Sequence, residues 1–300
     1  MKLVIDTDPG VDDAMAITFA ALHPDIELLG LTTVFGNVTA SQGTHNALYL
    51  SERLGLDIPV AEGANVPRVL PPFEPSAHVH GPEGFGDLKV PAPKGKAIAE
   101  TAAEFLCRVA RENPGQIVLC PVGPMTNVAD AIDLDPDFAK NLKSIVFMGG
   151  TLDRQGNVTP FAEANTWHDP HALDVVLQRG ANITMVGLDV TMKLILMAED
   201  FTKMAEINSV HGGFLRDISH FYLKFYKTVG EAGCGFHDPM TIIAALRPEL
   251  FKTESTPLGV VLDGEEIGRT YRTEGRPAVN VCVDLDVERV KAEFMEALAR

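Results

Sequence analysis

Short apolar runs alternate with amphipathic segments along most of the chain. The apolar runs are rich in β-branched residues and read KLVID, IELLGLTTVFG, IPVAEG, QIVLCPVG, SIVFMGG and NITMVGLDV. Continuous apolar runs of this length are typical of strands that are buried on both faces. The segments between them begin with polar residues and are expected to be helices: VDDAMAITFAALH, SQGTHNALYLSERLG, KAIAETAAEFLCRVARE, PMTNVADAIDL and DPHALDVVLQRG. The alternation predicts βαβ units, and therefore an α/β fold with a mostly parallel open sheet and helices on both faces.

Two regions interrupt this alternation. Residues 64–96 hold seven of the twenty prolines and predict a long irregular loop. Residues 211–236 read as an aromatic helix between glycines that could act as hinges, so we expect a lid-like element there. The tail after residue 256 is expected to form a few antiparallel or edge strands and a final helix. No segment resembles a linker, so residues 1–300 are expected to form a single domain.

Charge and cysteine content narrow the classes of function. The formal net charge is -16, which disfavours binding to nucleic acid or to an anionic membrane. No signal peptide is visible at the N-terminus, and no run of about 18 apolar residues suggests a membrane span. The four cysteines are scattered and form no CxxC pair, which favours reduced thiols in a cytoplasmic protein.

The candidate chemistry begins directly after the first apolar run. The stretch VIDTDPGVDDAMAI places Asp6, Asp8, Asp12 and Asp13 around one turn. Carboxylates this close destabilise one another unless a cation or strong hydrogen-bond donors neutralise them. In open, Rossmann-like sheets the carboxyl ends of the strands form the ligand site. Other predicted strand ends also carry polar or turn residues, as in TTVFGN, LCPVGPMTN and VFMGG, and we expect these loops to meet at the same edge.

An oxygen-rich cluster without cysteine or histidine favours Ca²⁺ or Mg²⁺ over zinc. The sequence DTDPGVDD does not match an EF-hand loop, because Gly10 stands at its fifth position and no glutamate closes the loop. Further ligands must therefore come from distant parts of the chain. Residues 237–239 are His-Asp-Pro, which places an imidazole next to a carboxylate at a predicted helix start, and they are one candidate source of such ligands.

These motifs together resemble a known family. DTDPGVDDAMAI, TTVFGNV, VGPMTN, FMGG, GNVTPFAEANTWHDP and FHDP occur in the order found in the inosine-uridine type nucleoside hydrolases. The resemblance extends over essentially the whole chain. It implies a Ca²⁺-dependent enzyme that hydrolyses the N-glycosidic bond of ribonucleosides to free base and ribose, and that forms a homodimer or homotetramer.

The resemblance also implies roles for individual residues. Asp8 would bind Ca²⁺ and act as the base that activates water, and His237 would donate a proton to the leaving base. The metal ligands would be Asp8, Asp13, the carbonyl of Val122 and Asp238. The positions matched to substrate binding are Asp12, Asn37, His80, Met148, Asn157, Glu163, Asn165, Phe225 and Asp238.

Several residues also have ordinary structural explanations. Asp6 is expected to support the ligands from behind, His78 to be a plain loop residue and Trp167 to lie in the core. The aromatic helix presents two pairs at helical spacing, of which one should face the core. Phe225 stands where family members carry a tyrosine, which weakens a role for a tyrosine hydroxyl in protonating the base.

Base specificity and two other functions remain open at this stage. A histidine at position 237 and a single tryptophan disfavour the purine-only subgroup, so we expect a pyrimidine-preferring or broad activity. One alternative is a phosphatase of the haloacid dehalogenase type, which also carries a DxD after its first strand, although Gly10 does not fit that motif. The other is a non-catalytic, cation-dependent protein that binds nucleosides or ribose; the presence of both Asp8 and His237 argues against it.

Overall fold

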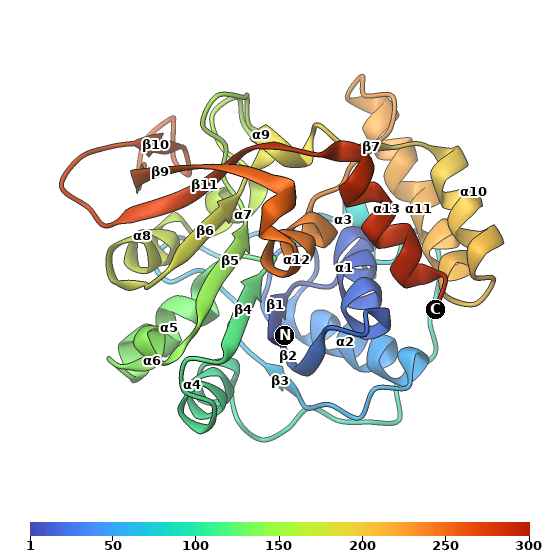
Figure 1. The fold of residues 1–300 in the computed structure, drawn as a ribbon, viewed down its shortest axis with the longest axis horizontal. Helices are drawn as coiled ribbons and strands as arrows, with labels where there is room; N and C mark the ends of the chain where they lie inside the picture. The colour runs from blue at the N-terminus through green and yellow to red at the C-terminus, as the bar shows by residue number, and fades with distance from the viewer.

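A nine-stranded sheet forms the centre of the protein (Figure 1). The computed structural model describes all residues, 1–300. The strand order is β10-β9-β11-β6-β5-β4-β1-β2-β3, and a separate pair of short strands, β7 and β8, lies outside the sheet. The strands are β1 (Lys2–Thr7), β2 (Glu27–Thr33), β3 (Val60–Glu62), β4 (Ile117–Pro121), β5 (Ser144–Met148), β6 (Ile183–Val186), β7 (Ile195–Leu196), β8 (Cys234–Gly235), β9 (Phe251–Val260), β10 (Thr270–Arg272) and β11 (Ala278–Leu285).

Most strand pairs in the large sheet are parallel, as the sequence predicts. Strands β1 to β6 and β11 run in parallel, and only the pairs of β9 with β11 and with β10 are antiparallel. From β1 the chain builds outward through β2 to β3 and then returns to add β4 on the other side of β1. This reversal leaves a crevice at the carboxyl ends of β1 and β4, the place where open α/β sheets bind their ligands.

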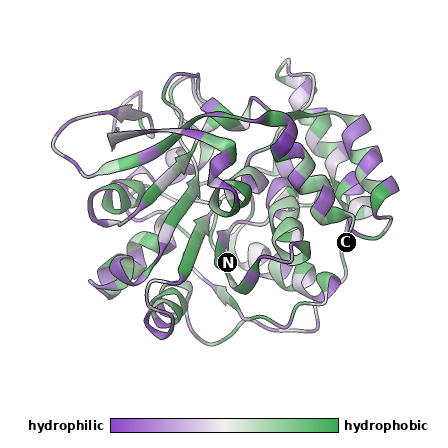
Figure 2. Ribbon diagram, in the orientation of Figure 1, coloured by the Kyte–Doolittle hydropathy of each residue, from purple (hydrophilic) through white to green (hydrophobic).

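Helices cover both faces of the sheet, each over its own apolar core. One face packs against α1 (Val11–Leu22), α2 (Ala40–Leu54), α12 (Asp238–Leu246) and α13 (Val287–Leu298). The other face packs against α4 (Ala102–Glu112), α5 (Thr126–Leu134), α6 (Phe138–Asn141) and α8 (Pro170–Arg179). Figure 2 shows apolar strands between helices whose outer surfaces are hydrophilic.

The central strands are apolar throughout because successive side chains enter opposite cores. In β1, Leu3 and Ile5 belong to the first core, whereas Val4 belongs to the second. The same alternation holds in β5, where Val146 faces the first core and Phe147 the second. A strand buried on both faces therefore needs no polar positions, which explains the continuous apolar runs of the sequence.

The remaining helices lie at the edge of the sheet or at its carboxyl end. Helices α10 (Ala198–Ile207) and α11 (His211–Thr228) pack on each other beside α1 and α13 (Figure 1). The short elements are α3 (Ala77–His80), α7 (Ala164–His168), α9 (Leu188–Thr191) and the 3-10 turn η1 (Pro248–Leu250). No helix is both long enough and apolar enough to cross a membrane.

Two sequence-based boundaries are wrong in detail, and a third region holds an unexpected helical turn. The helix expected from residue 96 begins only at Ala102, because Thr101 and Glu104 form a capping box there. The aromatic segment 211–236 is not one helix: α11 ends at Thr228, and the chain then turns into β8. The proline-rich region 64–96 is mostly irregular, as expected, but it contains the helical turn α3, which carries His80.

Candidate active site

A cavity of about 870 Å³ opens at the carboxyl ends of the parallel strands. Its lining comes from segments that are far apart in the sequence: the start of α1, the loops after β2, β4 and β5, the turn α3, helix α11 and the start of α12. The expectation that these strand-end loops share one site is therefore confirmed. The volume lies within the usual range of small-molecule pockets.

The turn between β1 and α1 is held together by Asp13. Its Oδ2 accepts a hydrogen bond from the Gly10 backbone N–H at 2.9 Å, and its Oδ1 accepts from the Asp8 N–H at 3.2 Å and from the Thr7 hydroxyl. Asp13 thus caps the helix that carries it. A side chain at Gly10 would collide with the His80 ring, since a Cβ would lie 2.5 Å from Nδ1, so glycine is required there.

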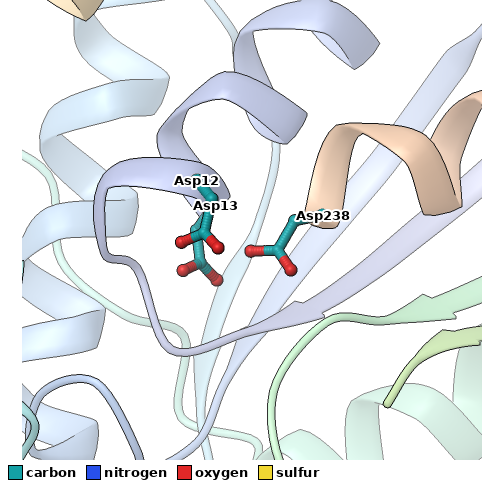
Figure 3. Close-up of side chains that lie close together, drawn as sticks. All are labelled: Asp12, Asp13 and Asp238. Carbon is teal, nitrogen blue, oxygen red and sulfur yellow. The ribbon is translucent and has the colours of Figure 1, made fainter. Parts of the chain in front are cut away.

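Three carboxylates face one another where helices α1 and α12 begin, and two of them, Asp12 and Asp238, line the cavity (Figure 3). Asp12 and Asp13 extend from the start of α1 and Asp238 from the start of α12, and one carboxylate oxygen of each lies within 4.8 Å of the others. All three side chains are buried. None of them forms an ion pair with a lysine or arginine; the only basic side chain within 4 Å is that of His80, whose Nδ1 lies 3.8 Å from Asp12.

Asp8 lies beside this group and not within it. Its Oδ2 accepts a hydrogen bond from the Asn37 N–H at 2.7 Å, whereas its Oδ1 has no hydrogen-bond partner. The backbone of the β4–α5 loop approaches closely, because a Cβ at Gly123 would lie 2.7 Å from that free oxygen. Val122, the preceding residue, lines the cavity.

Burial of so many acids raises their pKa values. Burial, reinforced by the neighbouring carboxylates, raises the pKa of Asp8 and of Asp238 well above the usual range. Burial raises the pKa of Asp12 to about 6, and that of Asp6, behind the turn, to about 7. An uncompensated group of buried anions is unfavourable, so the cluster fits a cation that would restore the charged forms.

The residue types suit a hard divalent cation. All the facing groups offer oxygen, no cysteine is present, and Oδ1 of Asp8 and Oδ1 of Asp12 are buried without a hydrogen-bond partner. Such oxygen-only sets favour calcium or magnesium over zinc. The structure therefore confirms a buried aspartate cluster that could hold a metal ion.

Amide and carboxyl side chains line the side of the cavity next to β4 and β5. Asn165 Nδ2 donates to the carbonyls of Val122 at 2.8 Å and Met148 at 3.3 Å, so it joins two strand ends. Glu163 accepts hydrogen bonds from three backbone N–H groups, those of Gly150, Asn165 and Thr166. Burial raises the pKa of Glu163 to about 7.

The remaining sugar-site residues of the sequence analysis also face this cavity. Asn37 Nδ2 donates to Asp13 Oδ2 at 3.0 Å, and Asn157 Oδ1 accepts from the Ala164 N–H at 2.9 Å. Both residues line the cavity, as do Met148, Glu163 and Asn165.

The opposite wall combines imidazole and phenol groups. His237 Nε2 lies 2.8 Å from the Tyr226 hydroxyl, and the Tyr222 hydroxyl donates to Asp12 Oδ2 at 3.1 Å. His80 Nδ1 accepts from the Val11 N–H at 3.2 Å. Burial lowers the pKa of His237 to about 3 and that of His80 to about 4, so both rings are neutral near neutral pH.

Two residues of this wall, Tyr222 and Tyr226, are not among the site residues expected from the sequence, whereas Phe225 is. Phe225 lines the cavity, with its ring 5.7 Å from that of His78, but it offers no hydroxyl. Tyr222 and Tyr226, on the buried face of α11, supply the hydroxyls instead. Their four-residue spacing is visible in the sequence, but only the structure shows that this pair faces the cavity.

Two expectations about aromatic and loop residues are wrong. Trp167 is not a core residue: it is half-buried, lines the cavity and packs on Phe73 with ring centroids 4.5 Å apart. Helix α7 is only five residues long, and the side chains that it buries are those of Thr166 and His168, not that of Trp167. His78 belongs to the turn α3 and also lines the cavity.

Comparisons with known proteins agree with this geometry. The sequence profile of the family described as inosine-uridine preferring nucleoside hydrolase matches residues 3–292. Uridine nucleosidase 1 of Arabidopsis thaliana is 42% identical over 282 residues, which cover 91% of this chain and 82% of the plant protein. These matches leave the phosphatase alternative without support.

Solved structures give the same result. A plant nucleoside hydrolase superposes with a TM-score of 0.96 at 36% identity, covering 99% of this chain and 98% of that one. A purine-preferring ribonucleoside hydrolase from Gardnerella vaginalis superposes with a TM-score of 0.95, also at 36% identity, covering 100% of this chain and 98% of its own. The chain belongs to the family of inosine-uridine preferring nucleoside hydrolases.

Proposed function

We propose that the protein is a calcium-dependent ribonucleoside hydrolase that cleaves the N-glycosidic bond and releases free base and ribose. The observation that carries this proposal is the set of buried carboxylates that face one another from the starts of α1 and α12, without a lysine or arginine partner. Membership of the family supports hydrolysis of nucleosides, and the buried carboxylates support the binding of a cation that takes part in it.

The cation would be held by Asp8, Asp13, Asp238 and the carbonyl of Val122. Each of these groups offers oxygen, and calcium accepts six to eight oxygen ligands in flexible geometry. When bound, the ion orients the ribose hydroxyls and makes the attacking water more acidic. Asp12, which is buried in the same group, is assigned to a ribose hydroxyl.

Asp8 is the proposed base for water. Its Oδ2 is fixed by the Asn37 N–H, which leaves the unpartnered Oδ1 free to accept a proton. A carboxylate held in this way is suited to general-base catalysis, because little reorganisation is needed during proton transfer.

The sugar is assigned to the amide-rich side of the cavity. The residues proposed to bind it are Asp12, Asn37, Met148, Asn157, Glu163, Asn165 and Asp238, all of which line the cavity. Cleavage of an N-glycosidic bond develops positive charge on the sugar ring, and carboxylates and amide dipoles stabilise that charge.

The base is assigned to the imidazole and phenol wall. His80 and Phe225 contact it, and the Nε2–H of the neutral His237 ring donates a hydrogen bond to the negative charge that develops on the departing base. The base then takes its proton from solvent. A hydrogen bond of this kind to a developing charge is worth roughly 10² to 10³ in rate. The hydrogen bond between His237 Nε2 and the Tyr226 hydroxyl supports the assignment, because Tyr226 lines the cavity.

We further propose a preference for pyrimidine ribonucleosides, or a broad specificity. The relative at 42% identity is named a uridine nucleosidase, which supports the pyrimidine preference. The wall around His237 offers one tryptophan at most, so it cannot sandwich a purine between two indole rings. The purine-preferring structure at 36% identity is the reason to keep broad specificity open.

A direct assay tests these proposals. Base release from uridine, cytidine, inosine and adenosine is followed by ultraviolet absorbance, and ribose release by a reducing-sugar assay, with the protein either loaded with Ca²⁺ or treated with chelator. We expect turnover that is fastest on uridine or similar on all four, and that is lost after chelation. Tight nucleoside binding by calorimetry without turnover would support the non-catalytic alternative instead.

Compartment and assembly belong to the same proposal. All four cysteines are buried and free, which supports a reducing, cytoplasmic location. A homodimer or homotetramer is proposed on family grounds, and light scattering coupled to size-exclusion chromatography tests it.

A further inference from the structure

Thr191 is a buried residue outside the cavity that contacts His237, the proposed hydrogen-bond donor to the leaving base. It is the last residue of α9, follows β6 and is fully buried. Its Oγ1 lies 2.8 Å from Nδ1 of His237, 46 residues away in the sequence. Thr191 does not line the cavity, so it acts on the substrate only through this imidazole.

The His237 ring is held at both nitrogens and along one edge. Nε2 lies 2.8 Å from the Tyr226 hydroxyl on the cavity side, and Nδ1 lies against Thr191 on the opposite side. The backbone of Gly235 touches the ring closely, because a Cβ there would lie 2.5 Å from Cε1 of His237. The ring is therefore fixed with Nε2 toward the cavity.

The direction of the hydrogen bonds follows from the groups available. The only partner of the Thr191 hydroxyl is Nδ1 of His237. A buried hydroxyl proton needs an acceptor, so Thr191 donates to Nδ1 and the ring hydrogen of the neutral imidazole lies on Nε2. The Tyr226 oxygen accepts that hydrogen. The next hydroxyl, that of Tyr222, donates to Asp12, so the bonds run in one direction toward the carboxylate.

We propose that Thr191 is a positioning residue for base release: its hydroxyl holds Nδ1 of His237 so that the Nε2–H faces the leaving base and can donate a hydrogen bond to the charge that develops on it, with the ring staying neutral throughout. This inference rests on the proposed function, because it requires His237 to assist the leaving group. A backbone carbonyl in the same place would fix the opposite tautomer, with the hydrogen on Nδ1, and would leave no proton facing the cavity.

Thr191 also has a backbone role, which the test must separate from the role of its hydroxyl. Its carbonyl accepts a hydrogen bond from the Phe236 N–H at 3.2 Å, which ties α9 to the segment before His237. Thr191→Val keeps this backbone contact and the shape of the side chain but removes the hydroxyl. Thr191→Ser keeps the hydroxyl and removes a methyl group.

The test compares a poor with an activated leaving group, using uridine and p-nitrophenyl riboside and the calcium-loaded protein. For Thr191→Val we expect kcat on uridine to fall roughly 10-fold to 100-fold, with KM nearly unchanged and the aryl riboside slowed no more than about 3-fold. Thr191→Ser should restore most of the uridine activity. Thr44→Val, which removes another buried threonine hydroxyl, on α2, is the matched control and should leave the ratio of the two substrates unchanged.

Equal losses on both substrates, or a serine variant no better than the valine variant, would overturn the inference and leave the proposed function intact. Absence of turnover in the wild type would instead reject the proposed function, and this inference with it. If Thr191→Val does not fold, the ¹⁵N spectrum of the wild-type imidazoles decides the question. A protonated Nε2 and a bare Nδ1 for His237 are expected, and the reverse would contradict the inference.

Discussion

At the scale of single residues, the two oxygens of Asp8 have different surroundings. One is fixed by the Asn37 N–H and the other is buried without a partner, beside a carboxylate cluster that already disfavours negative charge. An asparagine fits the same space and still accepts the hydrogen bond from Asn37. It can neither accept a proton from water nor attract a cation as strongly.

We therefore expect Asp8→Asn to fold normally and to lose turnover by roughly 10³-fold or more, the upper range for removal of a general base together with a metal ligand. Base release from uridine at saturating Ca²⁺ measures the loss. The variant should also be more stable than the wild type in chelator, because one buried carboxyl is gone. Residual activity within tenfold of the wild type would remove Asp8 from the role of base.

His237 gives a second prediction at this scale. His237→Ala should slow the release of uracil from uridine by roughly 10²-fold or more and slow p-nitrophenyl riboside far less, because an activated phenolate leaves without a hydrogen bond from the ring. Steady-state kinetics on both substrates measures the difference. Losses of similar size on the two substrates would mean that the ring acts in binding or packing and not as the donor to the leaving base.

The residues of the site differ in how far the sequence reveals them. Asp13 and Asp238 could be predicted, because each stands in a recognisable motif at a strand end or a helix start. Thr191 could not, since its only signal is a polar residue after a buried strand and its partner lies 46 residues away. Trp167 was misplaced because burial depends on how α7 sits above the sheet, which no local pattern encodes.

At the scale of elements, the strands could be predicted because a strand that is buried on both faces has a continuous apolar sequence. Most helices could be predicted as the amphipathic segments between these runs. The residue at which α4 begins could not be predicted from the sequence. The backbone N–H groups of Lys94 and Gly95 donate to Glu52, and that of Ile98 donates to the carbonyl of Val60. These contacts with distant segments hold the stretch before α4 in an extended path, although its composition favours a helix.

Asn127, at the start of α5, joins four segments through one buried side chain. Its Nδ2 donates to Asp6 at 2.7 Å and to the Thr33 carbonyl at 2.9 Å, and its Oδ1 accepts from the Ala64 N–H at 2.9 Å. It thus ties the ends of β1 and β2 to the first residues of the proline-rich region.

Asn127→Ala should lower the free energy of unfolding by about 2 to 4 kcal/mol, because two buried acceptors and one part-buried N–H group lose a partner. Denaturant unfolding of the calcium-loaded protein measures the change. Thr44→Val, which breaks hydrogen bonds made by helix α2, serves for comparison and should cost less. A loss below about 0.5 kcal/mol would show that Asn127 does not hold these segments together.

At the scale of the whole molecule, the acids of the site link folding to pH and to the cation. The protein carries a formal net charge of -16, and five of its eight buried acids gather at the carboxyl end of β1: Asp6, Asp8, Asp12, Asp13 and Asp238. In the absence of a cation these carboxyls favour their protonated forms. A bound cation favours the charged forms. The stability of the protein should therefore depend on pH differently with and without the cation.

The direction in which stability changes with pH follows from the pKa values of these carboxyls. Burial raises the pKa of Asp6 and Glu163 to about 7 and that of Asp8 and Asp238 well above the usual range, so the folded state without a cation holds protons that the unfolded state has lost. Stability therefore falls as pH rises through this range, by about 1.4 kcal/mol per pH unit for each carboxyl still protonated in the folded state. Burial lowers the pKa of the His80, His168 and His237 rings. These rings make stability rise with pH, but only below about pH 6.5, where histidines of the unfolded chain gain protons.

Between about pH 6.5 and 8, therefore, the carboxyls set most of the slope of stability against pH. Burial also raises the pKa of the four cysteine thiols, which add to the fall only toward pH 8, where thiols of the unfolded chain begin to lose protons. We expect the melting temperature in chelator to fall steadily across this interval, and the fall to be largely removed by saturating Ca²⁺, which keeps the same carboxyls charged in the folded state. Scanning calorimetry at several pH values, with and without the ion, measures both slopes. Parallel slopes in the two conditions would mean that the cation does not bind to these carboxyls, and a flat curve in chelator would mean that their protons are not retained on folding.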